Sequence, residues 1–318
     1  MLHLRQQGPV PTRCGSRTIA PNPMAKPAQL PINAHTNLLA VIGQPIEHSL
    51  SPCMHNAALA ELGLNWRYLA LPVAPEKLAA AVNGLAAIGC RGLSVTIPHK
   101  ENLKPLLSRV DSAAEQLGAI NCLVPDGQGG WWGSNTDWSG FLAPLQDRLS
   151  PGGTALVLGV GGVVRAVLRG CLELGVAKVL VRGRNGDRLA ALAEAVAPWA
   201  PPLQLLGWDE PLESHLAHTN LVINGTPLGM APWQEQSPLS AAQLAQLPGS
   251  ALVYDVIYSP RPTRLLQLAA ERGLACQDGL EMLVQQGAAA LRLWTGLEQV
   301  PVAAMRAAVE QALGNRAA

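Results

Sequence analysis

Two groups of residues in this chain have the types and spacing needed for chemistry on a small molecule. The first is glycine-rich: "VLGVGGVVRAVLRG", residues 157–170, places Gly159, Gly161 and Gly162 directly after a strand-like run and before a helical one. Free main-chain N–H groups and the positive end of a helix dipole favour a pyrophosphate there. The usual dinucleotide fingerprint has a third glycine where this chain has Val164, so the match is partial. A tight structural turn is the alternative.

The end of the next strand-like run indicates which dinucleotide binds. NAD sites usually carry an acidic residue there, whereas "VRGRNGDR" offers Arg182, Arg184 and Arg188. Paired guanidinium groups suit the 2′-phosphate of NADP. Asp187 falls where it would instead pair with an arginine or cap a helix. A solvated arginine cluster is the alternative, because surface arginines commonly pair without contacting a ligand.

The second group is polar and lies in the first half of the chain. Ser49 and Ser51 precede Pro52, a residue favoured at the first helical position, so Ser51 is the expected N-cap. The pattern leaves open whether the two hydroxyls only cap this helix or also bind a carboxylate. Lys100 follows "SVTIP" at the carboxyl end of a predicted strand and is expected at the start of a helix. Open α/β sheets bind their ligands at such strand ends.

Other polar residues strengthen the interpretation of Lys100, because a lone lysine at a helix start is more often a solvated side chain. Asn121 in "GAINCLV" and Asn135, Thr136 and Asp137 in "GSNTDWSGF" also fall near the ends of strand-like runs. Such residues converging on one cleft would bind a polyhydroxylated small molecule, with the lysine as a proton donor or acceptor.

The elements that must position these residues form two alternating series. The first contains "LLAVIG", residues 52–62, "WRYLALPV", residues 75–88 and "CRGLSVTI". The second contains "TALVLGVGG", residues 163–174, "AKVLVRG", residues 188–197, "LQLLG", "NLVINGT" and "ALVYDVI". Strands that alternate with helices predict βαβ units and mainly parallel sheets. A last helix, at about residues 281–295, is predicted to return to the first series.

The predicted fold class is therefore α/β with two domains. Residues 36–137, together with about 280–318, are expected to form a substrate-binding catalytic domain with a mainly parallel sheet. Residues 138–279 are expected to form a Rossmann-like NADP-binding domain.

Composition limits the function classes. The chain has 318 residues, a formal net charge of +1 and no basic run, which argues against nucleic acid as the main partner. No window approaches 18 uninterrupted apolar residues, so no transmembrane helix is predicted. The six cysteines show no CxxC pair and indicate neither a metal site nor a disulfide framework. We expect reduced thiols, a cytoplasmic location and a small-molecule ligand.

The first 35 residues differ from the rest. They are rich in proline, contain arginine and lysine but no acidic residue, and lack the apolar surface for a core. A disordered leader or an over-extended start before Met24 is expected. An organellar transit peptide is the alternative, although no amphipathic helical stripe is present.

Eight blocks in order resemble the shikimate dehydrogenase family over about residues 38–296. The blocks are "HSLSPCMHN", "GLSVTIPHK", "GAINCLV", "NTDWSGF", "GVGGVVRAV", "NGTPLGM", "DVIYSP" and "GLEMLVQQGAAALRLWTG". The resemblance implies a reversible hydride transfer between NADPH and the C3 carbonyl of 3-dehydroshikimate, giving shikimate, in aromatic amino acid biosynthesis. It implies no metal, and a monomer or homodimer.

The resemblance also assigns roles to single residues. Lys100 and Asp137 correspond to the family's catalytic pair, and the sequence leaves open which of them carries the proton. Substrate contacts are implied for Ser49, Ser51, Thr96, Asn121, Asp137 and Gln286. Cofactor contacts are implied for Gly159, Val160, Gly161, Gly162, Val163, Gly183, Arg184, Asn185, Arg188, Thr226, Ile257, Tyr258 and Gly279.

Several of these positions have structural alternatives. The family's Asn-Arg-Thr block aligns with residues 183–185, where two of the three residues are changed, which puts the strength of NADP selection in doubt. "NGTPLG" around Thr226 is also good turn chemistry, Tyr258 would suit a core, and Gln286 would suit an exposed helix face. The rival functions are a quinate-preferring dehydrogenase and a non-catalytic binding protein on the same fold. The latter would be expected to lack Lys100 or Asp137.

Overall fold

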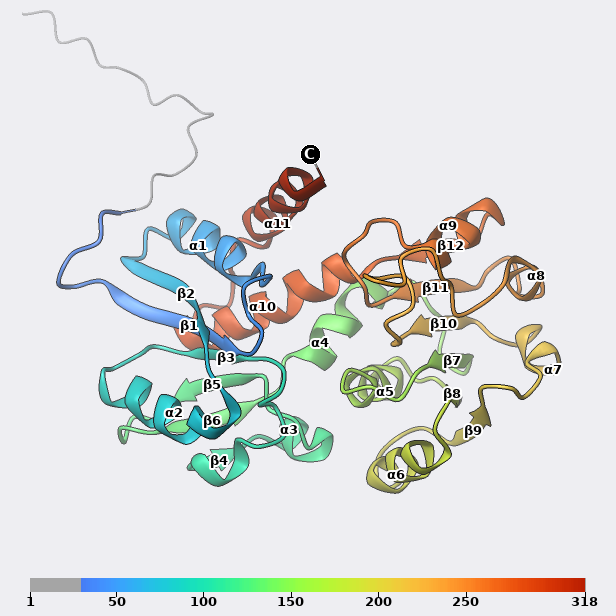
Figure 1. Cartoon of the computed structure of the whole chain (residues 1–318), viewed down its shortest axis with the longest axis horizontal. Helices are drawn as coiled ribbons and strands as arrows, with labels where there is room; N and C mark the ends of the chain where they lie inside the picture. Colours follow the sequence, from blue (N-terminus) through green and yellow to red (C-terminus); the bar gives the residue numbers. More distant parts are fainter. Residues whose placement is uncertain (1–29, 318) are drawn as a thin grey trace, which may run out of the picture.

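The computed structural model describes residues 30–317 and contains two six-stranded sheets (Figure 1). The strands are β1 (Asn37–Gly43), β2 (Trp66–Pro72), β3 (Leu93–Val95), β4 (Arg109–Val110), β5 (Cys122–Pro125), β6 (Trp131–Ser134), β7 (Thr154–Leu158), β8 (Lys178–Gly183), β9 (Leu203–Gly207), β10 (Leu221–Asn224), β11 (Leu252–Asp255) and β12 (Ala275–Gln277).

The helices lie between and beside these strands. The α-helices are α1 (Ser51–Glu61), α2 (Leu78–Ala87), α3 (Ser112–Leu117), α4 (Asp137–Leu142), α5 (Val164–Glu173), α6 (Gly186–Val196), α7 (Glu213–Leu216), α8 (Ala241–Leu244), α9 (Arg264–Glu271), α10 (Gly279–Thr295) and α11 (Val302–Ala317). Three short 3-10 helices are η1 (Pro75–Lys77), η2 (Lys104–Leu106) and η3 (Ala143–Leu145).

The first sheet has the strand order β2-β1-β3-β5-β6-β4. β1 runs parallel to β2 and β3, and its last five residues are buried, as expected for an inner strand covered on both faces. β5 is antiparallel to both β3 and β6, and β4 is parallel to β6. This sheet is therefore mixed, with a parallel half around β1.

The second sheet has the order β12-β11-β10-β7-β8-β9, and every neighbouring pair is parallel. Numbered from β7, this is the Rossmann order, with the strand order reversing between β7 and β10. Ligands bind at such a reversal, outside the carboxyl ends of the strands. The predicted fold class, with two α/β sheets and a Rossmann-like second half, is confirmed.

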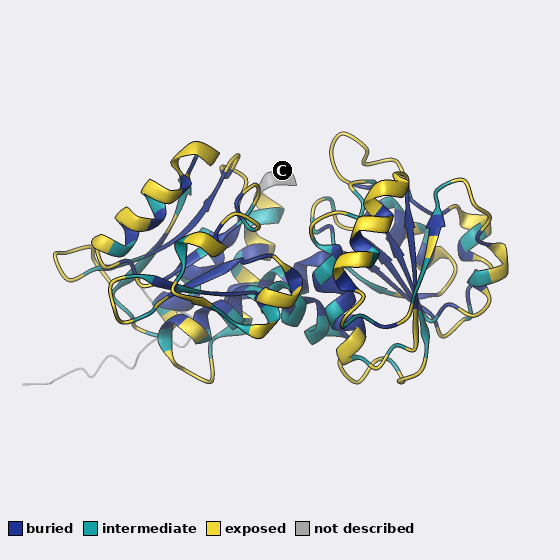
Figure 2. Cartoon of the chain, turned by 90° about the horizontal axis from the view of Figure 1, so that it is seen from below, coloured by how far each residue is buried: buried dark blue, intermediate teal, exposed yellow. Residues whose placement is uncertain are grey.

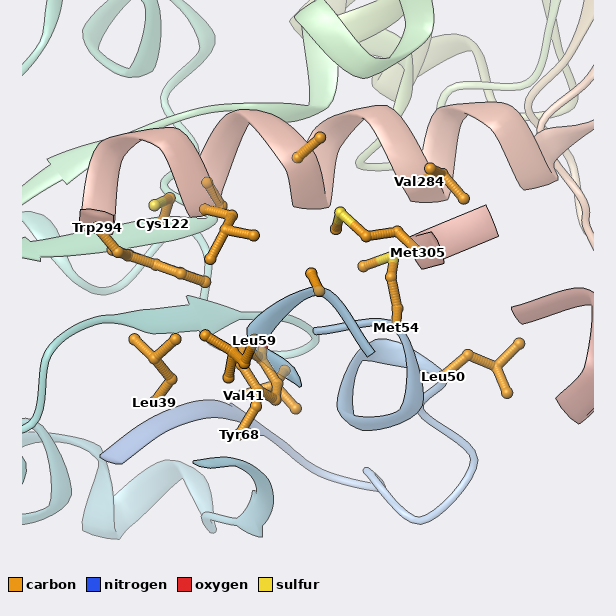
Figure 3. Close-up of a cluster of buried hydrophobic side chains, with 14 of the residues drawn as sticks. Leu39, Val41, Leu50, Met54, Leu59, Tyr68, Cys122, Val284, Trp294 and Met305 are labelled. Atoms are coloured by element: carbon orange, nitrogen blue, oxygen red, sulfur yellow. The ribbon is translucent and has the colours of Figure 1, made fainter. Parts of the chain in front are cut away.

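α10 returns from the second sheet to the first, as the sequence predicts. Figure 3 shows side chains beneath α10, including Val284 and Trp294, facing Met54 and Leu59 of α1. Trp294 Nε1 donates to the main-chain oxygen of Leu123 in β5 at 3.0 Å. Figure 2 shows buried residues where the two halves of the molecule meet. The exact domain boundaries stay a prediction.

Three further sequence predictions concern the chain ends, the membrane and the thiols. Residues 1–29 of the predicted leader lie outside the described residues. The last residues of that leader are described, and one of them, Asn33, accepts a hydrogen bond through its Oδ1 from Asn65 Nδ2 at 3.1 Å. None of the helices described between residues 30 and 317 has the length and apolarity to cross a membrane. The five cysteines in that range form no disulfide, and Cys14 lies outside it.

Candidate active site

The polar residues of the first half meet at one edge of the first sheet, and the strand directions explain why. β3 ends at Val95, so the chain carrying Thr96 and Lys100 leaves the sheet at this edge. Because β5 is antiparallel to β3, its start lies at the same edge, and the Val95 N–H donates to Asn121 O at 2.8 Å. β6 is antiparallel to β5 and returns to this edge just before Asp137. Asn121 is expected near the end of a strand-like run, and it lies at the N-terminal end of β5, directly before Cys122.

Lys100 and Asp137 form an ion pair at the centre of this edge. Lys100 Nζ lies 2.6 Å from Asp137 Oδ2, and Asn121 Nδ2 donates to Asp137 Oδ1 at 2.8 Å. Asn135 Oδ1 accepts the Asp137 N–H at 2.9 Å, and Asn121 Oδ1 accepts the Thr136 N–H at 2.7 Å. The Lys100 side chain is 30% exposed and that of Asp137 is 16% exposed. The side-chain amides of Asn121 and Asn135 hold Asp137 in place, and the ion pair is still exposed enough for a ligand to reach it.

The residue before Lys100 shows how its backbone is held. Lys100 lies in a turn, so the predicted helix start is wrong. The His99 ring is buried and its Nε2 lies 2.8 Å from the Val73 main-chain oxygen, and the Ile120 N–H donates to the Lys100 oxygen at 2.8 Å. These bonds anchor the turn on both sides and leave the lysine side chain to point outward.

Ser49 and Ser51 lie at the start of α1 and face the same cavity as Lys100. α1 begins at Ser51, which makes Leu50 (φ −91°, ψ −4°) the N-cap and Ser51 the first helical residue. The predicted N-cap position of Ser51 is therefore wrong. Ser49 Oγ instead accepts the Ser51 N–H at 3.3 Å. Two hydroxyls and a helix start thus point toward a place where an anion could bind.

A cavity of about 510 Å³, called here the lysine cavity, surrounds Lys100. Gln286 reaches it because α10 packs tightly on α4: a Cβ atom on Gly140 would lie 2.7 Å from Gln286 Cβ. The cavity is shared by both halves of the molecule, since Val163 ends the glycine loop. The predicted site residues that line it are Ser49, Ser51, Thr96, Lys100, Asn121, Asp137, Val163, Tyr258, Gly279 and Gln286.

The glycine loop after β7 fits a dinucleotide pyrophosphate. Gly159 has φ +105°, and a Cβ atom there would lie 2.9 Å from the Gly225 main-chain oxygen, so a side chain is excluded. A Cβ atom on Gly162 would meet nothing within 4 Å, which leaves the outer face of the loop open. The loop leads directly into α5, whose N-terminal end is the favourable one for phosphate oxygens.

A second cavity of about 540 Å³, called here the nucleotide cavity, lies beside this loop. Arg184 and Arg188 line it, whereas Arg182 is buried and donates to the main-chain oxygens of Trp208 and Glu210. The Asn185 side chain caps α6 by accepting the Arg188 N–H at 2.9 Å. The predicted residues that line it are Gly159, Val160, Gly161, Gly183, Arg184, Asn185, Arg188 and Thr226.

A buried polar network shapes the loops after β10 and β11. Asp255 accepts hydrogen bonds from Thr263 Oγ1 at 2.7 Å, the Ile257 N–H at 3.0 Å and Asn224 Nδ2 at 3.1 Å. Burial raises the pKa of Asp255 to about 6, although these hydrogen bonds act in the opposite direction. Asn224 Oδ1 accepts the Thr226 hydroxyl at 2.7 Å. The network therefore fixes Thr226 beside the glycine loop.

The cavity walls differ from the sequence predictions in two ways. Some predicted residues do not line them, and some residues that were not predicted do. Gly162 and Ile257 line neither of the two cavities, and their cofactor contacts stay predictions. Ser94 lines the lysine cavity, and its position two residues before Thr96 on the same strand face could have revealed it. Trp208 and Trp233 line the nucleotide cavity. Trp233 lies in a loop three residues after the "NGTPLGM" block, and no sequence signal identifies it.

Family models match both ends of the described chain. A model described as the shikimate dehydrogenase substrate binding domain matches residues 41–123. A model described as the shikimate 5′-dehydrogenase C-terminal domain matches residues 279–310.

Individual relatives match over most of the chain. A shikimate dehydrogenase (NADP(+)) of a Synechocystis strain is 50% identical over 285 residues, which cover 87% of this chain and 96% of that protein. A solved shikimate 5-dehydrogenase of Thermus thermophilus, in complex with NADP(H) and shikimate, is 37% identical with a TM-score of 0.76 and covers 87% of this chain and all of that one (100%). A quinate dehydrogenase of Corynebacterium glutamicum, in complex with NAD, is 31% identical with a TM-score of 0.79 and covers 87% and 99%.

Proposed function

The chain belongs to the shikimate dehydrogenase family, and we propose that Lys100 and Asp137 carry out its NADP-dependent reduction of 3-dehydroshikimate to shikimate. The protein is an oxidoreductase that acts on a CH–OH group and uses NADP. The observation that carries the assignment of the two residues is their 2.6 Å ion pair, which lies in a cavity that the glycine loop also borders.

The substrate is proposed to bind in the lysine cavity with its carboxylate toward Ser49 and Ser51. These hydroxyls and the start of α1 suit an anion, whereas Thr96, Asn121 and Gln286 offer neutral hydrogen-bonding groups for ring hydroxyls. A carboxylate at one end and the Lys100 amine at the other would orient the ring carbonyl toward the ion pair.

NADP is proposed to span the two cavities, with its 2′-phosphate near Arg184 and Arg188 and its pyrophosphate on the glycine loop. Val163 and Tyr258 line the lysine cavity on the side of the second sheet, where the nicotinamide end would enter. When bound, NADPH supplies the hydride that reduces the carbonyl carbon.

Lys100 and Asp137 would handle the proton and the developing charge. As the carbonyl carbon is reduced, negative charge grows on its oxygen, and an amine within hydrogen-bond reach stabilises that charge and delivers a proton to it. Asp137 would hold the Lys100 amine in place and accept a hydrogen bond from the substrate. Asn121 in turn holds Asp137 through its other carboxylate oxygen, at 2.8 Å.

A quinate-preferring activity is the alternative, because a solved quinate dehydrogenase shares this fold. The test follows NADPH or NADH formation with shikimate and, separately, with quinate, each with NADP and with NAD. We expect the highest kcat/KM for shikimate with NADP. A higher kcat/KM for quinate would contradict the proposed substrate, and no turnover of either would contradict the function. We also propose that the protein is a monomer or a homodimer.

A further inference from the structure

Arg165 stands at an unfavourable place for a cation unless its side chain has a specific partner. It is the second residue of α5, directly after the glycine loop, and the first turn of a helix carries the positive end of the helix dipole. The Arg165 side chain leaves this end and crosses to the other half of the molecule. There its Nη1 donates to the main-chain oxygen of Leu117, the last residue of α3, at 3.1 Å.

The receiving side of this contact is shaped for a guanidinium group. Gly118 follows α3 in the left-handed conformation (φ +60°), and a Cβ atom there would lie 2.9 Å from Arg165 Nη1. Glycine adopts this backbone conformation without strain and leaves room for the guanidinium group, which an added side chain would have to displace. The carbonyl end of α3 also carries the negative end of its dipole, which favours a cation.

A second arginine, one helical turn further along α5, extends the same contact. Arg169 Nη1 donates to Gln116 Oε1 of α3, and the Arg169 guanidinium lies 5.4 Å from the ring centroid of Trp138 in α4. Figure 1 shows α3, attached to the first sheet, facing α5 of the second. Arg165 and Arg169, on two consecutive turns of α5, thus both donate hydrogen bonds to the end of α3.

The segment that receives Arg165 leads directly to the catalytic pair. Two residues after Gly118, the Ile120 N–H donates to the Lys100 main-chain oxygen at 2.8 Å. The next residue, Asn121, donates to the Asp137 carboxylate. A short path of covalent and hydrogen bonds therefore connects the glycine loop, through Arg165, to the backbone of Lys100.

We propose that Arg165 is a positioning residue that fixes the nucleotide-binding half against the Lys100 turn, so that cofactor binding and substrate binding are coupled. This inference rests on the proposed function. Hydride transfer needs the two reacting carbons at close range, and a displacement of about 1 Å can lower the rate about 10²-fold. The cofactor is held by one half of the molecule and the substrate by the other. The hydrogen bond from Arg165 to Leu117 links these two halves of the molecule directly, at the end of α3.

The test compares Arg165→Met, which keeps the aliphatic stem, with Arg165→Lys, which keeps the charge. The control is Arg264→Ala, at the first residue of α9, because Arg264 Nη1 bonds to Gln267 Oε1 of its own helix at 3.2 Å. NADPH binding is titrated by its fluorescence with and without saturating shikimate. These two reduced compounds cannot react with each other, so the titration measures binding alone.

We expect shikimate to tighten NADPH binding in the unmodified protein at least about 5-fold, the lower end of usual coupling energies. In Arg165→Met this enhancement should disappear, while NADPH binding without shikimate stays within about twofold and kcat falls about 10- to 100-fold. Arg165→Lys should restore part of both effects, and Arg264→Ala should match the unmodified protein.

Two results would overturn the proposal: no enhancement in the unmodified protein, or equal enhancement and kcat in Arg165→Met. Either can be observed in a protein that oxidises shikimate normally. Failure of the proposed function would instead appear as no shikimate oxidation by the unmodified protein.

Discussion

Val160 of the glycine loop occupies the space beside Gly183 at the end of β8: a Cβ atom on Gly183 would lie 3.1 Å from Val160 Cγ1. The same atom would lie 3.1 Å from Leu189 Cγ. Residue 183 stands where many dinucleotide sites place a side chain for the ribose. Under the proposed function, we therefore expect recognition of the ribose and its phosphate at the end of β8 to depend on Arg184 and Arg188, which line the nucleotide cavity.

This packing predicts that Gly183→Ala lowers stability by about 1–3 kcal/mol, the usual cost of inserting a carbon into a filled site. Val160→Ala should relieve part of that loss, because it removes one of the two side chains that an added Cβ atom would meet at 3.1 Å. A double-mutant cycle by urea unfolding measures the coupling between the two changes. Strictly additive losses would show that Val160 does not restrict residue 183.

Arg184→Ala should weaken NADP binding by about 1.5–3 kcal/mol through the loss of a charged hydrogen bond to the 2′-phosphate. NAD binding, which lacks that phosphate, should change little. Arg182→Met is the matched control, because Arg182 is buried and bonds to main-chain oxygens. It should lower the thermal stability and affect both cofactors alike. Kd values for NADP and NAD decide between these patterns, and equal losses of both in Arg184→Ala would refute the assignment.

Lys100→Ala should lower kcat by roughly 10²- to 10⁴-fold, the usual range for a positioned acid or base, with a much smaller change in substrate KM. Asp137→Asn should act comparably, and the double variant should lose much less than the product, because the two residues form one unit. Lys104→Ala is the control, since Lys104 pairs with Glu115 at an exposed site. A normal kcat with a raised KM in Lys100→Ala would make the lysine a binding residue only.

Ser49→Ala should raise KM for shikimate roughly 10-fold, with kcat less affected, because a hydrogen bond to a charged group contributes about 1.5–3 kcal/mol. Ser49 also accepts the Ser51 N–H, so the thermal stability of the variant must be measured alongside the steady-state kinetics. An unchanged KM in a stable variant would place the carboxylate elsewhere in the cavity.

His55 should make the protein sensitive to acid. Its ring is fully buried against Tyr68, and burial lowers its pKa from 6.5 to about 3. The folded state keeps His55 neutral, so its favourable contribution is complete above pH 6.5 and is lost as the pH falls from 6.5 toward 3. The loss amounts to about 1.4 kcal/mol per pH unit, because only the unfolded chain takes up the proton.

The measurement is the free energy of unfolding of the unmodified protein and of His55→Leu between pH 7 and pH 4.5. The stability of the unmodified protein relative to the variant should fall steadily below pH 6.5. A constant difference over that range would mean that His55 does not titrate on unfolding.

The sequence by itself determined the local features of this protein. The glycine loop, the lysine after "SVTIP" and the alternation of strands and helices depend on neighbouring residues, and the structure contains the corresponding elements around β7, β3 and both sheets. The family resemblance came from the same short blocks. Each of these features is encoded within about ten residues, so pattern and turn chemistry suffice to find it.

Only the tertiary structure decided which side chains share a site. Asn121 lies beside Lys100 because β5 runs antiparallel to β3, a pairing that no local pattern states. Arg182 is buried inside β8, whereas Arg184 lies one residue beyond the end of that strand and lines the nucleotide cavity, because the chain leaves the packed sheet after Gly183. The bond from Arg165 to Leu117 joins residues 48 positions apart. Strand direction, the buried face and contacts between sheets all arise from long-range packing, which the order of residues does not display.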